Sequence, residues 1–151
     1  MKTFAALAIA AISLGVAAPA SAQFEKAEDA IKYRQSALFV MGQHFGRIGA
    51  MANGKAPYDA KAAQDNADIV ATLSHLPWAA FGPGTDKGAR TSAKPNVWTE
   101  QAKFQEHADK LQAATAQLAT AAKTNNLDNL KVAFGDAAKS CKACHDNYRA
   151  K

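Results

Sequence analysis

Four stretches of this 151-residue chain repeat apolar residues at steps of three and four positions. In the first, residues 28–51, six positions from Ile31 to Ile48 follow steps of 3, 4, 3, 4 and 3. This spacing places side chains on one face of an α-helix, whereas a half-buried strand would alternate at every second residue. The chain has almost no alternating segment of that kind. The sequence therefore predicts an all-α fold.

The other three helices are expected at 59–74, 97–123 and 127–148. Asp59 is a suitable N-cap for the second helix. The second helix has the weakest apolar face, which we assign to Ala62, Asn66, Ile69, Leu73 and Leu76. Helices of this period, joined mostly by short turns, predict an antiparallel up-down four-helix bundle. An irregular helical domain is the alternative.

The longest connection is expected at residues 77–96, which contain three prolines and three glycines. These residues prevent a continuous helix. Trp78 and Phe81 are large apolar residues within this loop, so we expect at least its first half to pack against the bundle. Loops of this length in small domains are often functional.

The N-terminus has the pattern of a secretory signal peptide. Lys2 precedes an apolar run over 4–18, and the small residues Ala20-Ser21-Ala22 follow. We expect export with cleavage after Ala22, which leaves residues 23–151 as one domain. The alternative, an uncleaved membrane anchor, is disfavoured because the run is short for a bilayer span. We therefore expect no stable membrane insertion.

The charge of the chain gives little support to nucleic-acid binding. The formal net charge is +5, and the signal peptide contributes only one of the basic residues. The lysines and arginines are scattered and form no long basic run. A basic group at the C-terminus has two interpretations, a site for a negatively charged partner or cations at a helix end. Its members are Lys139, Lys142, Arg149 and Lys151.

The last helix contains the motif Cys141-Lys-Ala-Cys144-His145. In an exported protein C-x-x-C-H predicts covalent attachment of one haem c. Two thiols one helical turn apart can form thioethers with the two vinyl groups of a haem. The adjacent imidazole of His145 can then act as the proximal iron ligand.

Three other interpretations of the cysteines are weaker. A zinc site needs about four ligands, and a second cysteine pair is absent from the sequence. A thioredoxin-like dithiol belongs at a helix start after a strand, and the sequence predicts no strand. A disulfide across one helical turn would be strained.

Arg34 is the charged member of the apolar face in the first helix. A buried, unpaired guanidinium is costly, and a haem propionate would satisfy it with a charge-assisted pair. Alternatively, its head extends to solvent. Gln35 is a candidate polar contact at the haem edge. Arg149, four residues after His145, either borders the proximal pocket or is a helix-end cation.

The residue that faces the iron from the first helix decides the function. Leu38 has no lone pair and would leave the sixth coordination position empty, whereas Met41 could ligate through sulfur. Spacing alone does not choose between them. The remaining histidines, His44, His75 and His107, are interpreted as surface or satisfied histidines.

Three segments together resemble the cytochrome c′ family of class II c-type cytochromes. They are "YRQSALFVMGQHFGRI", "LPWAAFGPGT" and "FGDAAKSCKACHDNYR". The resemblance covers essentially the whole chain after the signal peptide. Residues 86–94 depart from the family pattern, so no haem contact is assigned there.

The resemblance implies a periplasmic homodimer with a five-coordinate, high-spin haem that binds NO and CO in preference to O2. By matching position, Leu38 is the apolar residue on the vacant iron face, and Arg34 and Gln35 contact the haem. Trp78 and Phe81 match aromatics near the haem, and Arg149 matches a basic residue near the proximal histidine. Family dimers pack through the first two helices, for which Tyr33, Phe39 and Val40 are candidates, the alternative being packing within the monomer.

We therefore expect a gas-binding haem protein whose iron also cycles between oxidation states, with an unidentified redox partner. The alternative is a six-coordinate electron carrier with Met41 as the sixth ligand. A peroxidase-like enzyme would need a distal acid–base residue, and the face around Leu38 offers none. We expect no enzymatic activity.

Overall fold

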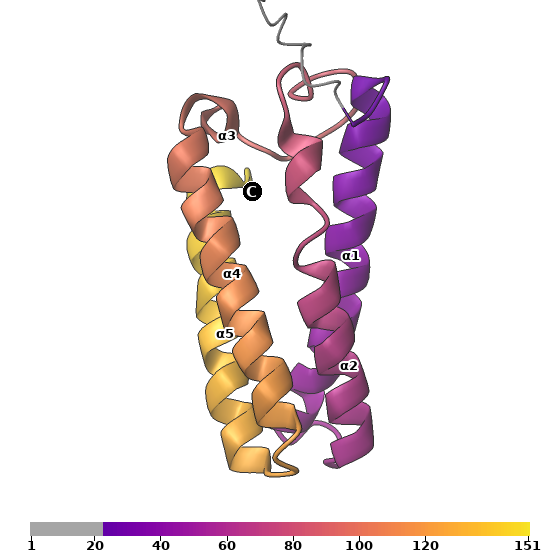
Figure 1. Ribbon diagram of the computed structural model, residues 1–151, viewed down its shortest axis with the longest axis vertical. Coiled ribbons are helices and arrows are strands. Elements are labelled where there is room, and N and C mark those ends of the chain that lie inside the picture. The colour runs from indigo at the N-terminus through magenta and orange to yellow at the C-terminus, as the bar shows by residue number, and fades with distance from the viewer. Residues whose placement is uncertain (1–22) are drawn as a thin grey trace, which may run out of the picture.

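Four long antiparallel helices form a bundle in the computed structural model, which describes residues 23–151 (Figure 1). The expected signal peptide lies outside the described residues. The long helices are α1 (Ala27–Ala52), α2 (Ala60–Leu73), α4 (Gln101–Ala122) and α5 (Leu127–Tyr148). Two short elements, η1 (Trp78–Phe81) and α3 (Asn96–Thr99), lie between α2 and α4. This arrangement confirms the predicted all-α, up-down bundle.

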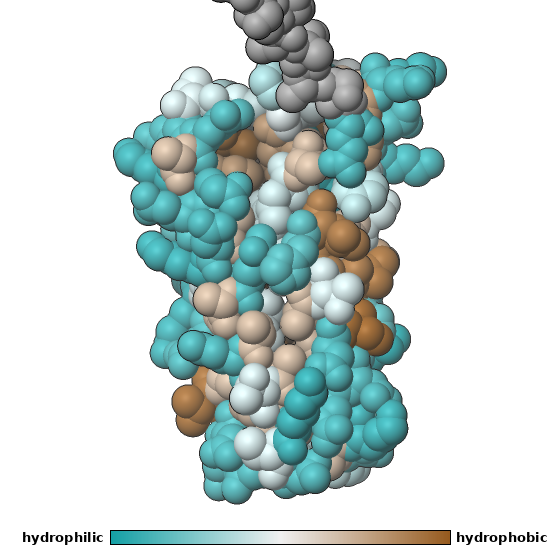
Figure 2. All heavy atoms as spheres, in the orientation of Figure 1, coloured by the Kyte–Doolittle hydropathy of each residue, from teal (hydrophilic) through white to brown (hydrophobic). Residues whose placement is uncertain are grey.

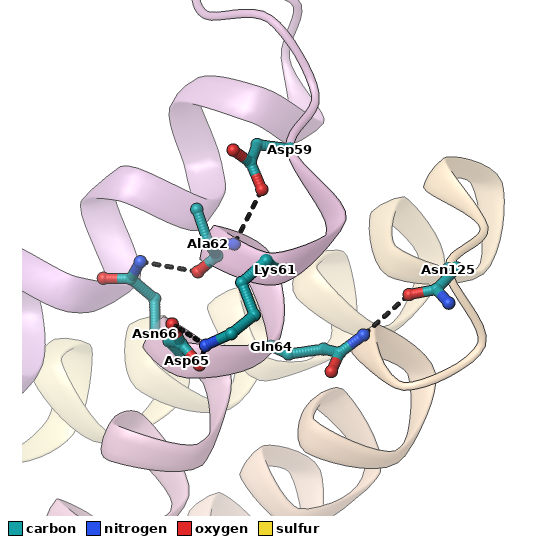
Figure 3. Close-up of polar contacts among 7 residues, drawn as sticks. All are labelled: Asp59, Lys61, Ala62, Gln64, Asp65, Asn66 and Asn125. Carbon is teal, nitrogen blue, oxygen red and sulfur yellow. Dashed lines mark hydrogen bonds and ion pairs between the residues drawn. The ribbon is translucent and has the colours of Figure 1, made fainter.

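Local sequence signals set the starts of α2 and α5. The carboxylate of Asp59 accepts a hydrogen bond from the backbone N–H of Ala62 at 2.9 Å, as expected for an N-cap (Figure 3). The side chain of Asn126 accepts from the N–H groups of Asp128 and Asn129. Gly54 follows α1 with φ 69°, a left-handed conformation that glycine adopts without strain.

The predicted helix over 97–123 is two helices in the structure. The chain breaks at Glu100 (φ −122°, ψ 42°) between α3 and α4. Val97 is buried, and Trp98 donates from Nε1 to the carbonyl of Gly82 at 3.0 Å. These tertiary contacts fix α3 independently of the axis of α4, so periodicity alone could not reveal the break.

The predicted apolar face of α2 is wrong by one position towards its end. Ile69 and Leu76 are 37% and 40% exposed, whereas Val70 and Ser74 are buried. Thr115 of α4 is also buried, and its hydroxyl donates to Ser74 Oγ at 3.1 Å. Ser74 Oγ also donates to the carbonyl of Ala71 within α2 at 2.7 Å. The packing of α2 against its neighbours, which the apolar pattern along α2 does not specify, determines which residues face inward.

The core consists of two clusters at opposite ends of the bundle. At one end, Phe45 stacks on Phe134 with ring centroids 4.5 Å apart. This lower cluster is built mainly from small and aliphatic residues: Met41, Ile48, Met51, Ala63, Ala67, Val70, Leu111, Leu118, Ala119, Ala122, Leu130 and Ala137. The upper cluster is mainly aromatic and contains Val97, Phe104 and Tyr148, with Trp78, Phe81 and Trp98 packed against them.

Polar side chains join the helices at the end of the bundle away from the upper cluster. Gln64 of α2 donates from Nε2 to Asn125 Oδ1 at 2.6 Å, which ties α2 to the α4–α5 turn (Figure 3). On the surface of α2, Lys61 pairs with Asp65 at 2.6 Å. Among the described residues, no helix is long and apolar enough to cross a membrane.

Some large apolar side chains remain on the surface of α1 and α2. Phe39 is 66% exposed and Val40 is 42% exposed. Figure 2 shows apolar residues gathered on the surface over α1. Tyr33 differs from these two, because its ring packs within the chain on Phe24 with centroids 5.1 Å apart.

Candidate functional site

A cavity of about 540 Å³ opens at the end of the bundle that contains the upper cluster. Its walls come from α1, from the 77–96 connection, from α4 and from α5, and they are mostly apolar. At this end α1 and the connection that contains η1 lie apart from α4 and α5 in the ribbon view (Figure 1). The size and lining are typical of a pocket for an organic ligand or cofactor.

The α5 wall of the cavity contains the whole C-x-x-C-H motif. Cys141, Cys144 and His145 all line the cavity, and both thiols are free. Burial raises the pKa of Cys141, and burial together with the neighbouring Cys141 raises the pKa of Cys144 to about 11. Burial thus favours the neutral thiol form of both cysteines, which disfavours their oxidation to a disulfide.

The imidazole of His145 lies beside these thiols. Partial desolvation and the nearby Arg149 lower its pKa, while Asp146 acts in the opposite direction. The neutral imidazole is the form that binds a metal ion. Within residues 23–151, no group of three or more His, Cys, Asp or Glu side chains is arranged around a common metal position, so the zinc interpretation gains no support.

The α1 wall is apolar at its centre. Leu38 is half-buried and Met41 is 7% exposed, and both line the cavity. Met41 also belongs to the lower core cluster, where it packs among aliphatic residues. Both candidates for the iron-facing position therefore lie on this wall.

Arg34 is buried at the edge of the same wall with 1% of its surface exposed. The alternative in which its head extends to solvent is therefore wrong. Nη1 donates to the carbonyl of Ala80 at 2.7 Å and to Thr85 Oγ1 at 3.2 Å. Nη2 donates to Thr91 Oγ1 at 3.2 Å. The sequence did not predict these partners, because all three lie in the connection 46 to 57 residues further along the chain.

The surroundings of the Arg34 guanidinium are neutral or aromatic. Its central carbon lies 4.5 Å from the ring centroid of Phe81 and 5.4 Å from that of Trp98. Burial lowers its pKa, and the more distant Asp86 partly offsets this. In the described part of the chain, no carboxylate forms a salt bridge with it. The group has more N–H donors than its three acceptors use, so it can also bind an anionic group in the cavity.

The other candidate residues also line the cavity. Gln35 donates from Nε2 to the carbonyl of Arg90 at 2.9 Å. Trp78 stacks near Phe81 with centroids 6.3 Å apart, and its Nε1 donates to the carbonyl of Ser74 at 2.6 Å. Arg149 lies on the rim, where its backbone pairs with that of Ala93. The structure thus places every residue proposed for the haem site around one cavity.

Several cavity residues were not predicted from the sequence. The rings of Phe104 and Tyr148 pack edge to face with centroids 5.2 Å apart, and both residues line the cavity. His107 also lines the cavity, and its ring centroid lies 5.6 Å from that of Tyr148. From the sequence it was interpreted as a surface or satisfied histidine. Its position one turn after Phe104 on α4 was the available signal. No sequence signal marked residues 91–93, which form part of the wall.

The other two histidines agree with their interpretation. His44 of α1 is hydrogen-bonded from Nδ1 to Asn66 Oδ1 of α2 at 2.8 Å, so it is a satisfied side chain between two helices. His75 is exposed beyond the end of α2. Neither lines the cavity.

A four-helix bundle whose last helix presents two cysteines and a histidine to one apolar cavity is the arrangement expected of a bundle-type c-type cytochrome. The family model described as cytochrome C′ matches residues 29–149. The chain therefore belongs to the cytochrome c′ family.

Individual relatives agree with this membership. The chain is 53% identical over 129 residues to cytochrome c′ of Rubrivivax gelatinosus. That alignment covers 85% of this chain and all of the relative. The crystal structure of that protein aligns with a TM-score of 0.82 over the same shares of the two chains. A nitric oxide complex of a mutant of cytochrome c′ from Alcaligenes xylosoxidans aligns with a TM-score of 0.79 at 49% identity. That alignment covers 85% of this chain and 99% of the other.

Proposed function

We propose that this chain is an exported c-type haem protein that binds NO and CO at a five-coordinate iron and undergoes redox cycling. Family membership supports a haem protein, and the nitric oxide complex of a relative supports gas binding. When bound, the haem would supply an iron atom that takes up a diatomic gas and changes oxidation state. The protein would bind and release its ligand without transforming it, so we propose no enzymatic role.

The observation on which this proposal depends is that the cavity joins the thiols and imidazole of α5 to an apolar wall of α1. Cys141 and Cys144 would hold the haem through two thioethers, and His145 would be the iron ligand. Arg34, buried without a carboxylate partner, would pair with a propionate. The residues present therefore fit the group that the family implies.

The remaining cavity residues would orient and enclose the haem. Trp78 and Phe81 would pack against it, and Gln35 would provide a polar contact at its edge. Arg149 on the rim would border the proximal side next to His145, whose pKa it lowers. On the α1 wall, the apolar side chains of Leu38 and Met41 would exclude water from the iron and would offer no hydrogen-bond donor of the kind that stabilises bound O2.

Leu38 would crowd the open position of the iron from the α1 wall. Its side chain has no donor atom, so a small ligand would compete only with steric contact. The alternative is that Met41, on the same wall, ligates the iron and gives a low-spin electron carrier. The membership of Met41 in the lower core cluster favours the first assignment, because a thioether already packed among aliphatic residues acts as a gap-filler.

An absorption spectrum of the purified, reduced protein with and without CO tests the proposal. We expect a high-spin spectrum that changes when CO is added. Met41→Leu should leave this spectrum unchanged, because the substitution preserves the side-chain volume and removes only the sulfur. A low-spin spectrum that CO leaves unaltered, and that becomes high-spin in Met41→Leu, would instead establish the electron carrier.

Export to the periplasm is part of the same proposal. The C-x-x-C-H motif fits an exported chain, and residues 1–22 have the signal-peptide pattern. N-terminal sequencing of the protein from a periplasmic extract should begin at Gln23. A protein that retains residues 1–22 in the membrane fraction would contradict export with cleavage.

We also propose that two copies associate through α1 and α2. Phe39 and Val40 of α1 and Ile69 of α2 are exposed apolar residues, and Leu76 lies just after α2. Exposed apolar side chains on neighbouring helices support a binding surface there. Ile69→Lys should shift the mass measured by sedimentation from dimer to monomer. Val132→Lys on α5 is the control, because Val132 is 69% exposed on a different helix and should not affect association.

A further inference from the structure

The helices α1 and α5 contact each other directly at the inner end of the cavity, which Phe45 also lines. There Phe45 stacks on Phe134, and a Cβ atom added to Gly49 would lie 2.8 Å from Phe134 Cζ. At the cavity end, the segment 82–94 forms contacts with both helices. We call this segment the strap.

On the α1 side, side chains hold the strap. Arg34 donates to the hydroxyls of Thr85 and Thr91, and to the carbonyl of Ala80 just before the strap. The neighbouring Gln35 donates to the carbonyl of Arg90 at 2.9 Å. Arg34 is the only buried member of this pair, and its guanidinium lies against two aromatic rings.

On the α5 side, the backbone holds the strap. The N–H of Ala150 donates to the carbonyl of Ser92 at 2.8 Å, and the N–H of Lys94 donates to the carbonyl of Tyr148 at 2.9 Å. Lys94 Nζ also donates to the carbonyl of Asp146 at 3.0 Å. Residues 91–93, between the two attachments, line the cavity.

The strap has little conformational restriction of its own. Two of its glycines have left-handed backbones, Gly84 with φ 78° and Gly88 with φ 111°. Glycine loses more conformational freedom on ordering than any other residue, so an ordered strap depends on contacts from outside. The planar guanidinium can reach several acceptors at fixed angles, which a lysine ammonium at the same place cannot do.

We propose that Arg34 is a positioning residue that holds the strap between α1 and the end of α5 and so sets the opening of the cavity. This role is additional to any pairing with a propionate. The positioning role depends on contacts within the chain and does not require that the proposed function is correct.

Limited digestion of the purified mature protein, residues 23–151, with trypsin tests the proposal. The strap contains two cleavable bonds, after Lys87 and after Arg90, whereas Pro95 protects the bond after Lys94. Cleavage of a native protein follows the population of the opened segment when reclosing is fast. Arg34→Ala removes three hydrogen bonds, so we expect cleavage at these two bonds to be about ten- to a hundredfold faster.

Arg34→Lys separates positioning from simple charge. It retains the positive charge but loses the planar guanidinium with its several N–H donors, so we expect cleavage nearly as fast as in Arg34→Ala. Cleavage of Arg34→Lys at the wild-type rate would overturn the proposal, because charge alone would then be sufficient.

Thr91→Val serves as the second variant, in case substitution of Arg34 prevents folding. It leaves Arg34 in place but removes the acceptor of Arg34 Nη2 and of the Ala93 N–H, so cleavage should be several-fold faster. An unchanged rate would overturn the proposal. Gln64→Ala is the matched control, because it breaks a hydrogen bond at the opposite end of the bundle and should leave strap cleavage unchanged. Haem content, measured on the same samples, tests the proposed function separately.

Discussion

The two ends of the bundle are built from helices of the same period, yet one end is filled and the other contains a cavity. At the filled end, alanines and Gly49 allow the helices to approach closely, and the rings of Phe45 and Phe134 stack between them. At the cavity end, large aromatic residues and the strap lie between the helix pairs. The difference shows that side-chain size along an apolar face, and not its period, decides whether helices pack on each other or on a ligand.

The largest expected effect comes from removing both thiols at the cavity end. The double variant Cys141→Ala, Cys144→Ala should abolish covalent haem, so that mass spectrometry gives the mass of the bare polypeptide. Ser140→Ala is the control, because Ser140 is an adjacent cavity residue without a role in attachment. Haem that remains covalently bound in the double variant would show that Cys141 and Cys144 are not its attachment site, and that the cavity end is not distinguished by them.

The filled end should respond to added volume. Gly49→Ala places a Cβ atom 2.8 Å from Phe134 Cζ, whereas Gly46→Ala has open space around the new atom. Both substitutions gain helix propensity, so the difference in their free energies of unfolding isolates the overpacking cost, which we expect to be about 1–3 kcal/mol. Chemical denaturation of the two variants measures it. Equal stabilities would mean that α1 and α5 are not closely packed there.

The α1 wall of the cavity should tolerate loss of volume better than a filled core. Leu38 is half-buried, so Leu38→Ala should cost about 1–2 kcal/mol of unfolding free energy, at or below the low end for a buried leucine. CO should associate faster, because steric cover is removed from the iron. Stopped-flow association and denaturation give the two readouts. An unaltered association rate would exclude Leu38 as the residue that limits ligand entry.

The smallest effects are expected on the surface of the filled end. Asp59→Ala removes the N-cap of α2 and should lower the free energy of unfolding by about 1 kcal/mol. Asp65→Ala breaks only an exposed ion pair with Lys61 and should change the free energy of unfolding by less than about 0.5 kcal/mol. Thermal or chemical denaturation compares them. If Asp65→Ala costs as much as Asp59→Ala, capping does not explain where α2 begins.

The sequence determined those features that depend on neighbouring residues. The apolar period predicted the four long helices, and Asp59 was identified as a cap from its residue type and position. The motif from Cys141 to His145 placed its three side chains within one helical turn, so their presence in one cavity wall follows from the helix itself. Such features are local, because backbone geometry fixes the relative positions of residues a few places apart.

Only the tertiary structure decided how distant segments meet. The exposure of Ile69 and Leu76 depends on how α2 is rotated against its neighbours, which places Val70 and Ser74 inward instead. The partners of Arg34, the separation of α3 from α4 and the place of His107 in the cavity likewise depend on contacts between elements. The physical reason is that burial and hydrogen bonding between elements are satisfied jointly, so an apolar pattern along one helix cannot specify its neighbours.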